Sequence, residues 1–85
     1  LLKNMKLKNI IKITNEVLVE EFEIEESIIT DEANFRETLD LDSLDYVDLV
    51  VFVEENFKVK LTAEDFQIVV TFHDFYNLIL KKIDE

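Results

Sequence analysis

The amino-acid sequence predicts an all-α domain: a four-helix bundle with three longer helices and one short helix. Apolar residues recur near the 3.6-residue helical period in separate stretches, and no convincing pair of strands competes with them. Apolar residues make up 48% of the 85 residues and include seven Phe, enough for a core of one small domain. We therefore treat residues 1–85 as a single domain. Because Gly and Pro are both absent, helix ends are read from capping residues and periodicity.

The first helix is predicted over residues 8–22, after a flexible N-terminus at residues 1–7. Its apolar residues keep helical spacing, and charged residues separate them. The apolar positions are Ile10, Ile13, Val17 and Phe22, and the charged ones are Lys12, Glu16 and Glu20.

Residues 23–41 contain scattered apolar residues without a sustained period, so they are predicted to form a long loop. Loops of this length are uncommon in compact domains and are often functional. We expect its apolar residues, such as Phe35 and Leu39, to anchor the loop on the core.

The second helix is predicted over residues 43–57. At 100° per residue, one arc should face the core, formed by Tyr46, Leu49, Val50, Val53 and Phe57. A narrower apolar stripe on the opposite side, flanked by acids, is typical of a docking surface, formed by Leu44, Val47 and Val51. The alternative is a buried strand at residues 49–53, since Val and Phe favour sheets.

Two further helices are predicted from capping-box patterns, Thr62-x-x-Asp65 and Thr71-x-x-Asp74. The third helix is short. The fourth is longer and should bury Phe72, Phe75 or Tyr76, Ile79 and Ile83 at helical spacing.

The charge balance restricts the possible partners. Twenty acidic and nine basic side chains give a formal net charge of −11, which repels nucleic acid and anionic membranes and favours basic protein partners. The chain has no Cys, and its longest apolar run, residues 49–53, is too short to span a bilayer. We expect a cytoplasmic monomer that binds neither nucleic acid nor membrane.

The residues offer little for catalysis or metal binding. The single His, His73, has no Cys or nearby hydroxyl to activate, so an ordinary surface or boundary position is expected. Asp40, Asp42 and Asp45 do not match a calcium loop, because no Gly stands at the turn and Val51 replaces the closing Glu. We predict that the protein is not an enzyme and holds no metal.

One segment remains, Leu39-Asp40-Leu41-Asp42-Ser43-Leu44-Asp45, at the junction of the loop and the second helix. Together with Ala33, Phe35, Asp48, Glu54, Glu55, Phe57 and the Thr71-Phe72 pair, it resembles the acyl carrier protein family. The resemblance covers about three-quarters of the chain in register and implies a stand-alone acyl-carrier fold.

In that family the Ser of the motif is the attachment point of 4′-phosphopantetheine, added by a separate phosphopantetheinyl transferase from coenzyme A with magnesium. The resemblance therefore implies that Ser43 is the modified residue and that Asp42 helps to hold the transferase-bound metal. A phosphodiester would also suit the positive end of a helix. Considered alone, Ser43 could instead be a helix N-cap, a role that Asp42 could fill equally well.

The resemblance also implies docking to acyl-processing enzymes through basic patches. The matching positions on the second helix are Leu44, Asp45, Val47, Asp48, Val51, Glu54 and Glu55. The tandem Gly common in peptidyl carriers is missing, which favours a carrier of fatty acid biosynthesis or of polyketide type.

Two departures from the family affect the expected site. Asp40 stands where family members usually have Gly, and Asp tolerates a left-handed backbone better than most residues. The acyl cavity implied by the resemblance would be lined by Phe35, Leu39, Val53, Leu61, Phe66, Val69, Phe75 and Leu78. Because Phe66 and Phe75 replace residues that are often small, we expect a smaller or reshaped cavity.

Two other readings of the sequence exist. The chain could be an acidic helical protein-interaction module without a prosthetic group, in which Ser43 is only a cap. An acidic mimic of nucleic acid is a further alternative, although much of this chain is used for the core.

Overall fold

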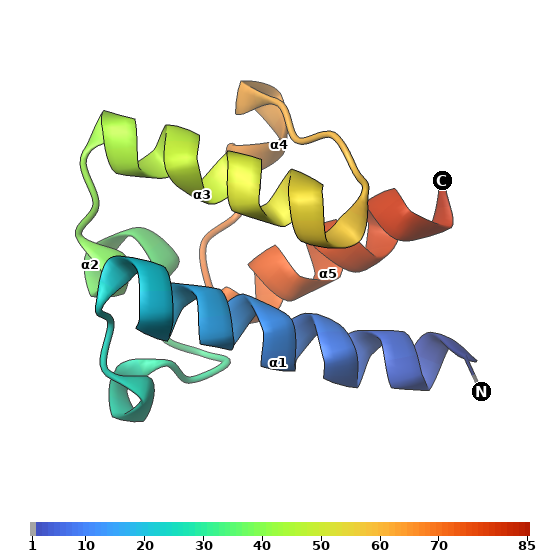
Figure 1. Ribbon diagram of the computed structural model, residues 1–85, viewed down its shortest axis with the longest axis horizontal. Helices are drawn as coiled ribbons and strands as arrows, with labels where there is room; N and C mark the ends of the chain where they lie inside the picture. The colour runs from blue at the N-terminus through green and yellow to red at the C-terminus, as the bar shows by residue number, and fades with distance from the viewer. Residues whose placement is uncertain (1) are drawn as a thin grey trace.

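The computed structural model describes the backbone of residues 2–85 and the side chains of residues 6–85. In this part of the chain the elements are α1 (Leu2–Phe22), the 3₁₀ turn η1 (Glu26–Ile28), α2 (Phe35–Leu39), α3 (Ser43–Phe57), α4 (Ala63–Phe66) and α5 (Phe72–Asp84) (Figure 1). The described residues form no named strand, and one isolated bridge joins Asn34 to Thr71. The all-α class and its three longer helices are confirmed, but there are two short α-helices rather than one.

Helix α1 begins earlier than the predicted residue 8. Of the segment 1–7 that the sequence predicts to be flexible, residue 1 lies outside the described residues and residues 2–7 belong to α1. The fully buried stripe of α1 is Ile10, Thr14 and Leu18, four residues apart, and α1 packs against α5 and α3. The predicted Ile13 and Val17 flank this stripe and are half-buried.

The predicted loop at 23–41 is anchored on the core, although it also contains η1 and α2. Asn34 caps α2 by accepting a hydrogen bond from the Glu37 N–H at 2.8 Å. Phe35 and Leu39 are buried, as expected. The Phe35 N–H donates to the Val70 carbonyl at 2.8 Å, which fixes this segment beside the start of α5. The loop prediction was wrong for α2, since five residues are too few to show a helical period.

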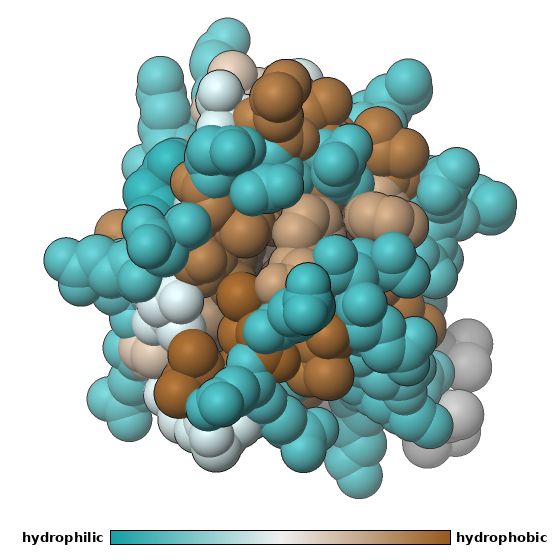
Figure 2. Space-filling view, turned by 60° about the vertical axis from the view of Figure 1, so that its left-hand side comes forward, coloured by the Kyte–Doolittle hydropathy of each residue, from teal (hydrophilic) through white to brown (hydrophobic). Residues whose placement is uncertain are grey.

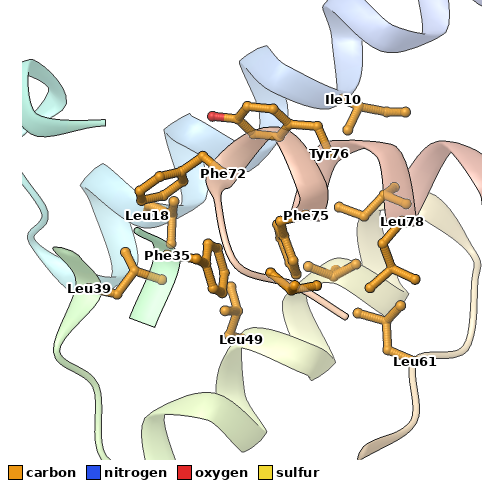
Figure 3. Close-up of a cluster of buried hydrophobic side chains, with 13 residues drawn as sticks. Ile10, Leu18, Phe35, Leu39, Leu49, Leu61, Phe72, Phe75, Tyr76 and Leu78 are labelled. Carbon is orange, nitrogen blue, oxygen red and sulfur yellow. The ribbon is translucent and has the colours of Figure 1, made fainter. Parts of the chain in front are cut away.

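The core lies between the three long helices and is rich in aromatic rings (Figure 3). The Phe35 ring stacks on Phe75 with centroids 4.5 Å apart and meets the edge of Phe72 at 5.2 Å. Leu49 and Val53 of α3 close the same cluster. Aromatic pairs at these separations add to the stabilisation from buried area.

Both predicted capping boxes are present. Thr62 and Asp65 exchange hydrogen bonds at the start of α4, with lengths of 2.8 and 3.2 Å. Thr71 and Asp74 do the same at the start of α5, at 3.0 and 3.1 Å. In a chain without Pro, these boxes are the signals that begin α4 and α5.

Among the described residues, no helix is both long enough and apolar enough to cross a membrane.

Candidate functional site

The site is built around the turn that leads from α2 into α3. Asp40 ends α2 in the left-handed conformation, with φ 48° and ψ 45°, and its N–H donates to the Arg36 carbonyl at 2.9 Å. This is the conformation that Gly usually supplies at a helix end, and Asp is one of the few other residues that adopt it readily. The Asp at this position therefore preserves the turn.

Asp42, rather than Ser43, is the N-cap of α3. Its Oδ1 accepts a hydrogen bond from the Asp45 N–H at 2.8 Å, and its carbonyl accepts from the Tyr46 N–H at 3.1 Å. Ser43 is the first residue of the helix and is exposed. Its hydroxyl forms no hydrogen bond with any described residue. The sequence allowed either Asp42 or Ser43 as the N-cap, and the structure shows that it is Asp42.

The position of Ser43 gives its hydroxyl a defined electrostatic setting. The first backbone N–H groups of a helix have no partner within it and form the positive end of the helix dipole. A phosphate attached to Ser43 would lie at this end of a fifteen-residue helix. The helix end favours an anionic group on the Ser43 oxygen, while the neighbouring carboxylates of Asp42 and Asp45 oppose it.

Helix α3 has the two apolar faces predicted from its sequence. Leu49 and Val53 are buried on the inner face, and the helical conformation of residues 49–53 excludes the strand alternative. On the outer face, Leu44, Val47 and Val51 are 75%, 59% and 46% exposed. Figure 2 brings the end of the molecule with α2 and the start of α3 forward, and shows apolar atoms exposed among hydrophilic side chains.

The four acids predicted on this helix differ in their surroundings. Asp48 and Glu55 are exposed, whereas Asp45 and Glu54 are half-buried. The Glu54 Oε2 accepts a hydrogen bond from the Leu61 N–H at 3.1 Å, so this carboxylate also holds the segment before α4. No local sequence pattern indicates this second role, because Glu54 and Leu61 meet only in the folded chain.

A cavity of about 370 Å³ opens beside Ser43, between α3 and α4. Of the eight residues predicted to line an acyl cavity, Leu61 and Phe66 line this one. The other six are packed in the buried core: Phe35, Leu39, Val53, Val69, Phe75 and Leu78. In the core, the Phe75 ring stacks on Phe35 and lies tilted against Phe66, and the open space lies beside Ser43 instead.

Sequence reasoning missed several residues that line the cavity, namely Arg36, Tyr46, Val50, Thr62 and Ala63. Tyr46 and Val50 were assigned to the core-facing arc, which is correct, but this arc also borders the cavity. Arg36 lay in the segment expected to be a loop. Its helical spacing from Phe35 and Leu39 could have placed it on the outside of α2.

The Arg36 guanidinium lies over the Tyr46 ring in the wall of this cavity. The guanidinium carbon lies 5.8 Å from the centre of the Tyr46 ring, and Nη2 donates to the Phe66 carbonyl at 3.3 Å. The Tyr46 hydroxyl is buried without a hydrogen-bond partner among the described residues. Burial raises the pKa of Tyr46, the Arg36 charge opposes this rise, and the Asp40 charge adds to it.

The remaining candidate groups do not gather into a reactive centre. His73 is exposed, and among the described residues no group of three or more His, Cys, Asp or Glu side chains could hold a metal ion.

Comparison with known proteins identifies the family. Residues 15–79 match the family described as "Phosphopantetheine attachment site". The chain belongs to this family. Its prosthetic group is therefore covalently attached 4′-phosphopantetheine, as the sequence resemblance implied.

A solved structure with the same fold supports this family membership. The crystal structure of an acyl carrier protein from Thermotoga maritima superposes with a TM-score of 0.75 at 28% identity, covering 94% of this chain and 93% of that one. The predicted resemblance to acyl carrier proteins is confirmed.

Proposed function

We propose that this phosphopantetheine-attachment protein is an acyl carrier that bears its arm on Ser43 and holds acyl intermediates as thioesters. The observation that supports the proposal best is the Ser43 hydroxyl, which is exposed and unbonded at the first residue of α3. Asp42 caps the helix, so modification of Ser43 removes no structural contact.

Attachment requires only a nucleophilic oxygen that a transferase can reach. In the reaction, the Ser43 Oγ–P bond forms and the P–O bond of the coenzyme A pyrophosphate breaks. Adenosine 3′,5′-bisphosphate leaves, and the hydroxyl proton passes to a base of the transferase. The attached arm supplies a thiol, which the cysteine-free chain lacks.

Asp42 is the residue that we propose supports the transferase-bound magnesium. Its Oδ1 is used by the helix cap, and its Oδ2 has no hydrogen bond among the described residues. A carboxylate oxygen beside Ser43 is the kind of ligand that Mg²⁺ prefers.

We further propose that the outer face of α3 docks acyl-processing enzymes. The docking face consists of the exposed apolar side chains of Leu44, Val47 and Val51 with the acids Asp45, Asp48, Glu54 and Glu55. Apolar contact area rimmed by acids complements a basic patch with an apolar centre, and the net charge of −11 would speed the encounter. Enzymes of fatty-acid or polyketide type are the proposed partners.

The thioester is tested by loading an acyl group onto the arm-bearing protein with a purified acyltransferase and then adding neutral hydroxylamine. We expect an added acyl mass that hydroxylamine removes, and no acyl mass on Ser43→Ala. Acyl mass that persists after hydroxylamine, or that appears on Ser43→Ala, would show that the cargo is held elsewhere in another linkage.

A further inference from the structure

The cavity beside Ser43 differs in charge from the rest of the molecule. The chain has a net charge of −11, yet the residues that line this cavity include one cation, Arg36, and no acid. Most of the remaining wall is apolar, with Val47, Val50, Leu61 and Phe66 as its larger members.

Two hydrogen-bond donors in this wall are not fully used. The guanidinium of Arg36 has five N–H donors, and one of its nitrogens donates to the Phe66 carbonyl. The guanidinium carbon of Arg36 lies 5.8 Å from the centre of the Tyr46 ring. The Tyr46 hydroxyl is buried without a hydrogen-bond partner among the described residues. An unsatisfied buried hydroxyl is unfavourable, so a ligand oxygen that reached it would be favoured over a methylene group.

The size of the cavity limits the ligand. At about 370 Å³ it lies at the low end of the range for small-molecule sites, which suits a short or medium chain. Phe35 and Phe75, stacked at 4.5 Å in the buried core, do not line this cavity, so it does not extend between them.

We propose that this cavity selects acyl groups that bear a second oxygen function, a ketone or a carboxylate, over plain alkyl chains. Arg36 and Tyr46 are the specificity-determining residues, with the guanidinium and the phenol donating to that oxygen. The proposal rests on the attachment of the arm at Ser43, which lines the same cavity.

The test loads three arms of equal chain length onto the full chain, using a broad-specificity transferase with octanoyl-, 3-oxooctanoyl- and octanedioyl-coenzyme A. Thermal unfolding of each loaded protein is then compared with that of the unacylated arm-bearing form. We expect the two oxygenated arms to raise the midpoint by a few degrees more than octanoyl does. The Arg36 Nε–H signal in NMR spectra should shift with these arms and not with octanoyl.

Two variants test the Tyr46 and Arg36 donors one at a time, against the ketone arm and the carboxylate arm respectively. Tyr46→Phe keeps the ring under Arg36 and removes the hydroxyl, so the advantage of the 3-oxo arm should shrink. Arg36→Gln keeps a donor and removes the charge, so the advantage of the octanedioyl arm should be lost. The matched control is Lys12→Gln on α1. Like Arg36→Gln, it removes one positive charge from an exposed side chain, but Lys12 does not line this cavity.

Each outcome decides the proposal. An octanoyl arm that stabilises wild type as much as the oxygenated arms would overturn it, as would an unchanged preference in both variants. If intact mass shows that no arm is attached, the proposed function fails first and the selectivity fails with it. If arms attach without any preference, only the selectivity fails.

Discussion

Asp42 and Ser43 differ in their contacts at the start of α3, although either could have capped the helix. The Asp42 carboxylate accepts the Asp45 N–H at 2.8 Å, while the Ser43 hydroxyl points to no partner among the described residues. A residue that caps the helix is needed for stability, whereas a residue that receives a modification should be dispensable for it.

This difference in contacts predicts unequal losses of stability for two neighbouring substitutions. Asp42→Ala should lower the free energy of unfolding by about 0.5–2 kcal/mol, because the cap is lost. Ser43→Ala should change it by less than about 0.5 kcal/mol, as expected for an exposed residue without contacts. Urea unfolding at equilibrium measures both. A larger loss for Ser43→Ala than for Asp42→Ala would mean that Ser43 is the structural cap.

At Asp40, the sequence carried enough information to foresee the backbone. The prediction that Asp preserves the turn usually made by Gly agrees with its φ of 48°. Lys58 adopts a similar left-handed conformation at the end of α3, with φ 57°, and nothing in its residue type indicated this. Because the chain has no Gly, other residue types occupy the left-handed positions, and these types predict that conformation less clearly than Gly does.

At the scale of elements, helices were predictable where a cap or a long period marked them. The bounds of α3 match the prediction, and both capping boxes lie where the Thr and Asp spacing placed them. Helix α2 was missed because it has five residues, and the cavity wall was missed in part because Arg36 comes from that helix. Contacts such as Glu54 with Leu61 depend on packing and leave no local pattern.

The capping box of α5 gives a prediction at this scale. Asp74 Oδ2 accepts the N–H groups of Val70 and Thr71 at 2.9 and 3.0 Å, so Asp74→Ala should cost about 1–2 kcal/mol in urea unfolding. Glu64→Ala, an exposed acid in α4 with no side-chain hydrogen bond, is the matched control and should cost far less. Equal losses in the two variants would contradict a capping role.

The Asp74 carboxyl also predicts how the stability of the fold changes with pH. Hydrogen bonds from the Thr71 and Val70 N–H groups hold the pKa of Asp74 below its ordinary value, against a smaller opposing effect of burial. Because the folded pKa is the lower one, this stabilisation is present above the unfolded pKa of about 3.9 and is lost as pH falls through the folded pKa. Asp74→Ala should therefore lose less stability than wild type on acidification.

At the scale of the whole molecule, the two ends of the chain meet through α1 and α5. The Tyr76 hydroxyl donates to Asn15 Oδ1 at 2.7 Å across 61 positions of sequence. Burial raises the pKa of Tyr76 to about 12, although the hydrogen bond to Asn15 acts in the opposite direction. No local sequence pattern could have predicted this pair, because it depends on how α1 lies against α5.

Alkaline unfolding tests this long-range contact. The unfolded phenol ionises near pH 10, so the Tyr76 contribution is complete below that pH and is lost as pH rises from about 10 to 12. Wild type should lose more stability over this interval than Tyr76→Phe, as measured by urea midpoints at each pH. Parallel losses in the two proteins would show that Tyr76 ionises as freely in the fold as in the unfolded chain.

The net charge of −11 is a property of the whole molecule and follows from composition, whereas the exposed apolar face of α3 followed from helical spacing. The helical fold followed from periodicity and capping residues, and the family followed from one motif in register with those helices. The proposed docking face and the proposed cavity selectivity both depend on attachment of the arm at Ser43.

Attachment at Ser43 is tested by the intact mass of the protein after incubation with coenzyme A, magnesium and a broad-specificity phosphopantetheinyl transferase. We predict one added phosphopantetheine arm on the wild-type chain and none on Ser43→Ala. A folded wild-type protein that gains no mass, or a Ser43→Ala variant that gains the same mass, would contradict it.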